Sequence, residues 1–195
     1  MGPFPDGVYR AEFPYLYRAP GCMTEAEAVD YYVKKLEDVF IEASPAEYVA
    51  AIVVEPVQGE GGFVPAPIEW VKAVRKICDE KGILLVADEV QTGFARSGRM
   101  FATDYWKEAG AAPDIITLAK SIAGGMPLSA VVTSSEIMDG VTPGTIGGTY
   151  CGNAVACASA LAVIEEMEKE DYPAKARKIA DKIMATWNEW KEKYE

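Results

Sequence analysis

Two apolar runs that each end in a charged side chain constrain this chain more than any other feature. Residues 82–91 read Gly-Ile-Leu-Leu-Val-Ala-Asp-Glu-Val-Gln, so the first run delivers the carboxylate of Asp88 to its polar end. The second run, residues 115–119, ends at Lys120. Short apolar runs of this kind are typical of buried strands. The sequence therefore predicts a carboxylate and an amine at the ends of two strands.

A strand-end aspartate and a strand-end lysine are what pyridoxal phosphate (PLP) chemistry needs. The lysine amine forms a Schiff base with the cofactor's aldehyde, and the carboxylate keeps the pyridine nitrogen protonated so that the ring accepts electrons. Taken alone, the alternatives for Asp88 are a helix cap or a buried ion pair, and a lone Lys120 is more often a surface lysine. The two residues together favour the PLP interpretation.

Strand-like and helix-like segments alternate along the chain, which favours an α/β fold. Buried strands are predicted at 48–54, 83–87, 115–118 and 129–133, and helices at about 24–43, 67–81, 101–109, 152–168 and 176–194. Residues 1–22, rich in Pro, Gly and Tyr, predict an extended arm.

Composition excludes several classes of function. The chain has 195 residues, a net charge of −11 and no histidine. Its acidity argues against nucleic acid as a partner, and the lack of histidine excludes Ser-His-Asp and Cys-His mechanisms. The four cysteines form no Cys-x-x-Cys pair, so no metal site is expected. No apolar stretch is long enough to span a membrane, and no signal peptide is apparent, so a cytoplasmic location is expected.

Four sequence motifs add to the evidence for a PLP enzyme. They are Glu-Pro-Val-Gln-Gly-Glu-Gly-Gly (55–62), Asp-Glu-Val-Gln-Thr-Gly-Phe-Ala-Arg-Ser-Gly (88–98), Ala-Lys-Ser-Ile-Ala-Gly-Gly-Met-Pro (119–127) and Gly-Gly-Thr-Tyr-Cys-Gly-Asn (147–153). In this order the chain resembles the class III aminotransferases, which are fold-type I PLP enzymes. Phe-Ala-Arg-Ser-Gly and Gly-Gly-Thr-Tyr are most similar to the 4-aminobutyrate aminotransferases. The resemblance implies a three-layer α/β/α sandwich with a mostly parallel mixed sheet, the PLP-transferase large domain, present in part.

The resemblance also implies a role for each residue that matches the family's motifs. Lys120 would hold the cofactor covalently, and Asp88 would contact its pyridinium nitrogen. Val90 would pack on the ring, and Gln91 would contact the phenolic oxygen. Thr149, whose alternative is an N-cap, would bind the phosphate of the cofactor in a neighbouring subunit. That last contact implies a homodimer with composite active sites.

Three glutamates near these motifs also receive an interpretation. The resemblance places Glu55 beside Gln91 and the substrate. It pairs Glu60 with a substrate-gating arginine that lies further along the family's chain, beyond residue 195. Glu89, next to Asp88, is expected to make structural contacts only.

Some parts of the family pattern cannot be placed in the chain. They are a Gly/Ser phosphate loop, an aromatic–His pair that stacks on the ring, and the arginines that bind substrate carboxylates. A central fragment is therefore expected, with residues 1–168 as a partial PLP-binding large domain and 169–195 as the start of the C-terminal small domain.

The parent enzyme is expected to move an amino group from an ω-amino acid such as 4-aminobutyrate to 2-oxoglutarate. Two alternatives remain open within the enzyme class: an acetylornithine/ornithine-type aminotransferase, and an amino-acid racemase of the same fold. A third alternative is a truncated, non-catalytic interaction protein.

Overall fold

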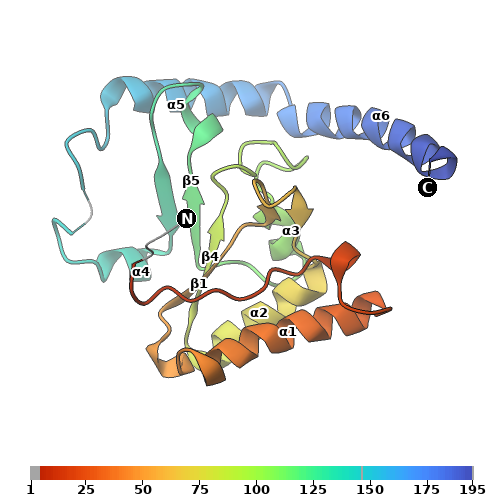
Figure 1. The fold of residues 1–195 in the computed structure, drawn as a ribbon. Helices are drawn as coiled ribbons and strands as arrows, with labels where there is room; N and C mark the ends of the chain where they lie inside the picture. The colour runs from red at the N-terminus through yellow and green to blue at the C-terminus, as the bar shows by residue number, and fades with distance from the viewer. Residues whose placement is uncertain (1–4, 146, 195) are drawn as a thin grey trace. The chain divides into compact units, whose positions relative to one another are not determined.

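The computed structural model describes residues 5–145 and 147–194, which belong to two compact units (Figure 1). One unit comprises Met1–Ala87 and Tyr105–Asp114, and the other comprises Asp88–Asp104 and Ile115–Glu195. Of the predicted arm, residues 1–4 lie outside the described part of the chain, and residues 5–22 contain only a short 3-10 helix, η1 (Leu16–Arg18).

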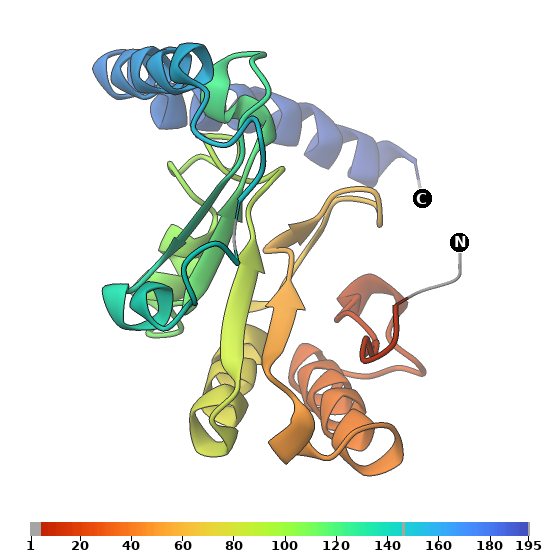
Figure 2. The same ribbon diagram turned by 90° about the vertical axis from the view of Figure 1, so that its left-hand side faces the viewer.

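Two amphipathic helices of the first unit lie side by side (Figure 2). Helix α1 (Glu25–Glu42) begins with a capping box, in which Thr24 accepts from the Glu27 amide and Glu27 accepts from the Thr24 amide. The amide and the hydroxyl of Thr24 both donate to the Glu27 carboxylate, and these two bonds hold the pKa of that carboxyl below its ordinary value. Helix α2 (Ile68–Lys81) ends at Gly82, whose φ of +68° provides the left-handed turn that glycine adopts without strain.

The buried faces of these helices form the main core of the first unit. Helix α1 contributes Ala28, Val29, Tyr32 and Leu36, and α2 contributes Trp70, Val71, Val74, Ile77 and Cys78. These positions recur at helical spacing, which is why the sequence predicts both helices correctly.

Strand pairing is both parallel and antiparallel. In the first unit β1 (Ala51–Val54) runs parallel to β4 (Leu84–Asp88), as Figure 2 shows. In the second unit β5 (Ile115–Leu118) pairs with β6 (Ala130–Thr133) in antiparallel fashion. The predicted α/β class, with a mixed set of strands, is confirmed.

The chain also forms short elements that the sequence did not predict. A two-stranded hairpin, β2 (Val57–Gln58) and β3 (Val64–Pro65), encloses the Gly-rich loop at 59–62. The strand predicted from residue 48 begins only at Ala51, because η2 (Ala46–Tyr48) follows Pro45 as a 3-10 turn. Two further short helices were not predicted, η3 (Lys120–Ala123) and α4 (Ser135–Asp139). Helix α3 (Thr103–Glu108), in contrast, lies where a helix at about 101–109 is predicted.

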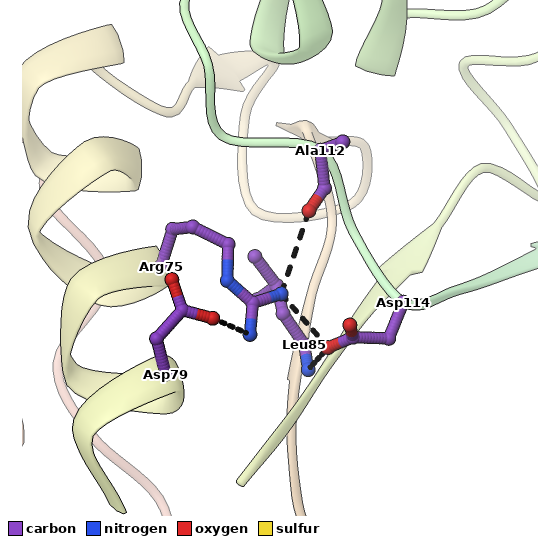
Figure 3. A network of polar contacts seen from close by, with 5 residues as sticks. All are labelled: Arg75, Asp79, Leu85, Ala112 and Asp114. Atoms are coloured by element: carbon purple, nitrogen blue, oxygen red, sulfur yellow. Dashed lines mark hydrogen bonds and ion pairs between the residues drawn. The ribbon is translucent and has the colours of Figure 1, made fainter. Parts of the chain in front are cut away.

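An ion-pair network ties helix α2 to strand β4 within the first unit (Figure 3). Arg75 contacts Asp79 and Asp114 at 2.8 Å each, and Asp114 also accepts from the Leu85 amide at 2.7 Å. Arg75 donates to the Ala112 carbonyl as well. Burial alone would lower the pKa of Arg75, but the bonds and charges of Asp114 and Asp79 raise it above its ordinary value.

The second unit contains two long helices, α5 (Ala154–Lys169) and α6 (Tyr172–Lys193). Its core comprises Phe94, Leu118, Ile122, Ala123 and Ala160. The helix predicted at about 176–194 is present as α6, but α6 has no buried residue in the described chain. The predicted domain boundary between residues 168 and 169 stays a prediction.

Candidate functional site

The segment that follows β4 is fixed by its own hydrogen bonds. Oδ1 of the half-buried Asp88 accepts from the Val90 amide at 3.0 Å. The Glu89 amide donates to the Thr117 carbonyl at 3.0 Å. Because Thr117 lies on β5, close before Lys120, this bond brings the Asp88 segment beside the chain that leads to the lysine.

A hydrogen bond joins two of the predicted site residues directly. The Lys120 amine donates to Oε1 of Gln91, and the two atoms are 2.5 Å apart. Lys120 is exposed, whereas Gln91 and Val90 are half-buried. The structure thus gathers Asp88, Val90, Gln91 and Lys120 within the second unit.

The backbone at Lys120 is in a conformation that side chains disfavour. Its φ is +46°, and it opens the 3-10 helix η3 directly after strand β5. Non-glycine residues with positive φ are uncommon and cluster at functional sites. Gly124 then reverses the chain with a φ of +57°, and a Cβ there would lie 3.0 Å from Cγ2 of Val163 on α5. The turn that presents the lysine therefore depends on glycine.

An open cavity of about 720 Å³ lies at this turn. It is lined by Lys120, Ser121, Gly124 and Gly125, and by residues of α5 that include Ser159 and Val163. Ser159 donates to the Ala123 carbonyl at 2.9 Å, which attaches α5 to the lysine turn. A small molecule in this cavity would contact the lysine.

Thr149 is exposed and does not cap helix α5. Asn153 is the cap, since its Oδ1 accepts from the amides of Val155 and Ala156 at 3.0 and 3.1 Å. Within the described ranges no hydrogen bond joins Thr149 to Lys120 or the other predicted site residues. The N-cap alternative for Thr149 is wrong, and its phosphate-binding role stays a prediction.

Glu55 and Glu60 belong to the first unit. Oε2 of the half-buried Glu55 accepts from the Gly59 amide at 3.0 Å, and this bond closes the turn that leads into the loop at 59–62. Glu60 is exposed on that loop. The substrate roles of both glutamates stay predictions.

Glu89 is the residue whose importance the sequence understates. It is fully buried, and its carboxylate accepts four hydrogen bonds, from the Thr92 hydroxyl, the Ala102 amide, and the amide and hydroxyl of Thr103. The expectation of structural contacts is confirmed. Its only sequence signal is a carboxylate directly after a buried strand.

The donors and acceptors at this place fit PLP. Oδ1 of Asp88 is engaged by Val90, while its Oδ2 receives no hydrogen bond from the part of the chain that the structure describes, so it is available to a protonated ring nitrogen. The exposed Lys120 amine is accessible to an aldehyde. For the phosphate, the predicted residues offer only the Thr149 hydroxyl.

Within residues 5–145 and 147–194, no group of three or more His, Cys, Asp or Glu side chains is arranged to hold a metal ion. In the same ranges no helix combines the length and the apolar character needed to cross a membrane.

Comparisons with known proteins agree on one family. The family model for class-III aminotransferases matches residues 1–195. The chain is 45% identical over 194 residues to a 5-aminovalerate aminotransferase of Pseudomonas putida, covering 100% of the chain and 43% of that protein. It is 43% identical to a 4-aminobutyrate aminotransferase of Escherichia coli, covering 94% and 41%. A leucine/methionine racemase of Thermococcus litoralis is 42% identical, covering 96% and 42%.

Solved structures give the same answer for the fold. An amine transaminase from an uncultivated Pseudomonas species, in the PLP-bound (internal aldimine) form, matches with a TM-score of 0.84 and 38% identity. The match covers 94% of the chain and 43% of that protein. The chain thus has the fold of PLP transaminases and spans less than half the length of these relatives.

Proposed function

The chain belongs to the class-III aminotransferases, and we propose on this basis that the whole protein transfers an amino group from an ω-amino acid to 2-oxoglutarate. 4-Aminobutyrate is the proposed donor. Relatives named for 4-aminobutyrate and 5-aminovalerate support this class of donor, at 43% and 45% identity. PLP is the cofactor of the family.

The observation that carries the proposal is the contact between Lys120 and Gln91. It places the primary amine of Lys120 next to the side-chain amide of Gln91. The Asp88 carboxylate lies on the same segment as Gln91, where it accepts a hydrogen bond from the Val90 amide. The non-catalytic alternative gives no reason for a lysine with positive φ at this position. The geometry therefore favours an enzyme.

Each residue would do one part of the chemistry. PLP, when bound, supplies an electron sink for the bonds at the amine-bearing carbon of the substrate. Lys120 would hold the cofactor covalently, and its Nζ, once released, would take up the proton lost by that carbon. Asp88 would keep the ring nitrogen protonated through Oδ2, because an adjacent anion favours the charged form.

The remaining predicted residues would position the cofactor and the substrate. Val90 would pack on the ring, and Gln91 would exchange its bond with Lys120 for one with the phenolic oxygen. Thr149 would bind the cofactor phosphate of a neighbouring subunit, which makes the active protein a homodimer. A cytoplasmic location stays a prediction.

The substrate side of the proposal rests on the two glutamates of the first unit. Glu55 would lie beside the substrate. Glu60 would pair with an arginine that belongs to the remainder of the whole protein.

A racemase is the second candidate. The 42% identity to a leucine/methionine racemase, over 96% of the chain, favours it. The third candidate is an acetylornithine/ornithine-type aminotransferase, and a solved ornithine aminotransferase with 36% identity to the chain supports it.

The test is an assay of the purified whole protein with 2-oxoglutarate and, separately, 4-aminobutyrate, 5-aminovalerate, ornithine, acetylornithine and L-leucine. We expect glutamate to form fastest with the ω-amino acids that carry no α-amino group. Racemisation of leucine without glutamate, or a preference for acetylornithine, would contradict the proposed donor class.

A further inference from the structure

A fully buried carboxylate belongs to a residue that lies, in the sequence, among the residues proposed to contact the cofactor. Glu89 separates Asp88 from Val90 and Gln91 in sequence, and its side chain is 0% exposed. Oε2 accepts from the Thr92 hydroxyl at 2.6 Å and the Ala102 amide at 3.0 Å. Oε1 accepts from the amide and the hydroxyl of Thr103, both at 2.7 Å.

The main chain of Glu89 is held as firmly as its side chain. Its amide donates to the Thr117 carbonyl at 3.0 Å, and its carbonyl accepts from the Gly93 amide at 2.9 Å. A Cβ at position 93 would lie 2.9 Å from that carbonyl oxygen, so only glycine leaves the bond undisturbed. One residue thus connects the Asp88–Gln91 segment to strand β5, which leads to Lys120, and to the 102–103 turn.

From this arrangement we propose that Glu89 is a positioning residue, which holds Asp88 and Gln91 in register with Lys120. The inference rests on the proposed function and deepens it. Glu89 does not reach the cofactor, because all its polar atoms are directed to protein donors and acceptors within the second unit. It acts through the neighbours on either side of it.

A carboxylate is required here because every group around it donates. Two of the four donors are backbone amides, which cannot reverse their role. In Glu89→Gln, one side-chain oxygen becomes an NH2 group, so either the Ala102 or the Thr103 amide faces a second donor. The hydroxyls of Thr92 and Thr103 can rotate to accept, but one backbone amide loses its bond in each orientation. The turn must shift, and Asp88 and Gln91 shift with it.

The experiment compares three variants of the whole protein. Glu89→Gln changes the proposed positioning residue, and Thr103→Val removes only one of its four bonds. Asp114→Asn is the matched control, because Asp114 also accepts a backbone amide, that of Leu85, but in the first unit. Each variant is loaded with PLP and measured for its melting temperature, for kcat and KM with 4-aminobutyrate, and for the pH midpoint of the cofactor's absorbance change.

We expect Glu89→Gln to lower kcat by about ten-fold or more with little change in KM, since a misplacement of about 1 Å costs up to about a hundred-fold. The pH midpoint should rise by about half a unit or more. A ring nitrogen that Asp88 holds less firmly is less often protonated, so it carries less positive charge. The nearby nitrogen that joins Lys120 to the cofactor then holds its own proton more tightly. Thr103→Val should shift both quantities in the same direction but less. Asp114→Asn should lower the melting temperature and leave kcat and the midpoint within error.

Two outcomes would overturn the proposal separately. If Glu89→Gln or, should that variant not fold, Thr103→Val moves kcat and the pH midpoint no further than Asp114→Asn, the role of Glu89 is only structural. If the unmodified protein binds no PLP through Lys120, the proposed function itself fails, and the positioning role fails with it.

Discussion

Nζ of Lys120 lies 2.5 Å from Oε1 of Gln91, although the two residues come from different segments of the second unit. The bond between the Glu89 amide and the Thr117 carbonyl holds these segments together. Gln91 thereby holds the lysine amine at one position before any aldehyde reaches it. An amine held in this way loses less conformational freedom when it forms a covalent bond.

Asp88→Asn should cripple the whole protein without unfolding it. The asparagine keeps an oxygen for the Val90 amide, so we expect the free energy of unfolding to change by less than about 1 kcal/mol. A neutral amide does not hold the ring nitrogen protonated, so kcat should fall by at least about a hundred-fold. Urea unfolding and steady-state kinetics measure the two effects, and near-normal turnover would refute the role of Asp88.

Thr149 and Asn153 form a matched pair at the start of α5. Thr149→Ala should leave stability unchanged but weaken PLP binding by the whole protein about ten- to hundred-fold, since a hydrogen bond to a charged group contributes about 1.5–3 kcal/mol. Asn153→Ala should do the reverse and cost about 1 kcal/mol of stability, because it removes the helix cap. A loss of stability in Thr149→Ala with unchanged PLP affinity would contradict the assignment.

The buried thiol of Cys78 should make the free energy of unfolding depend on pH. Burial raises the pKa of its thiol from 9.0 to about 11, and the charge of Arg75 opposes this only in part. Because the pKa is higher in the folded chain, the unfolded chain releases the proton first as pH rises. The thiol's contribution is therefore complete below about pH 9 and lost towards pH 11, by about 2–3 kcal/mol.

Urea unfolding of the whole protein and of Cys78→Ala, each at about pH 8 and at about pH 11, tests this. The fall in unfolding free energy should be larger in the unmodified protein, because the variant lacks the titrating thiol. An equal fall in both proteins would show that the pKa of the Cys78 thiol is the same in the folded and the unfolded chain.

Features that depend on local periodicity could be predicted from the sequence. The capping box at Thr24, the end of α2 at Gly82 and the strand that carries Asp88 all follow from patterns over a few residues. The contact between Gln91 and Lys120 was not predicted. The resemblance to a family implied only that each residue contacts the cofactor, and no local pattern specifies how two strand ends approach each other.

Other features depend on tertiary packing and were missed. The β2–β3 hairpin joins strands of two residues, which are too short to show alternation. The positive φ of Lys120 is imposed by its surroundings, since intrinsic preference opposes it. The four donors around Glu89 come from residues up to 14 positions away, so the sequence shows a carboxylate but not its burial.

The 195-residue chain alone should bind PLP weakly and show no measurable transamination of 4-aminobutyrate with 2-oxoglutarate. The cofactor ring would be contacted by Asp88, Gln91 and Lys120. For the phosphate dianion, the only predicted contact is Thr149, which is predicted to bind the cofactor of a partner subunit. A dianion gains little by leaving water for so few donors. The exposed Trp187 and Trp190 of α6 should also promote association of the isolated chain. Micromolar binding with steady turnover would contradict this prediction.

Covalent attachment of the cofactor at Lys120 is the most direct test of the account as a whole. The whole protein is incubated with PLP, reduced with borohydride, digested and mapped by mass spectrometry. We predict a pyridoxyl group on Lys120, and no label in a Lys120→Ala control. A pyridoxyl group on another lysine, with Lys120 unmodified, would contradict the account.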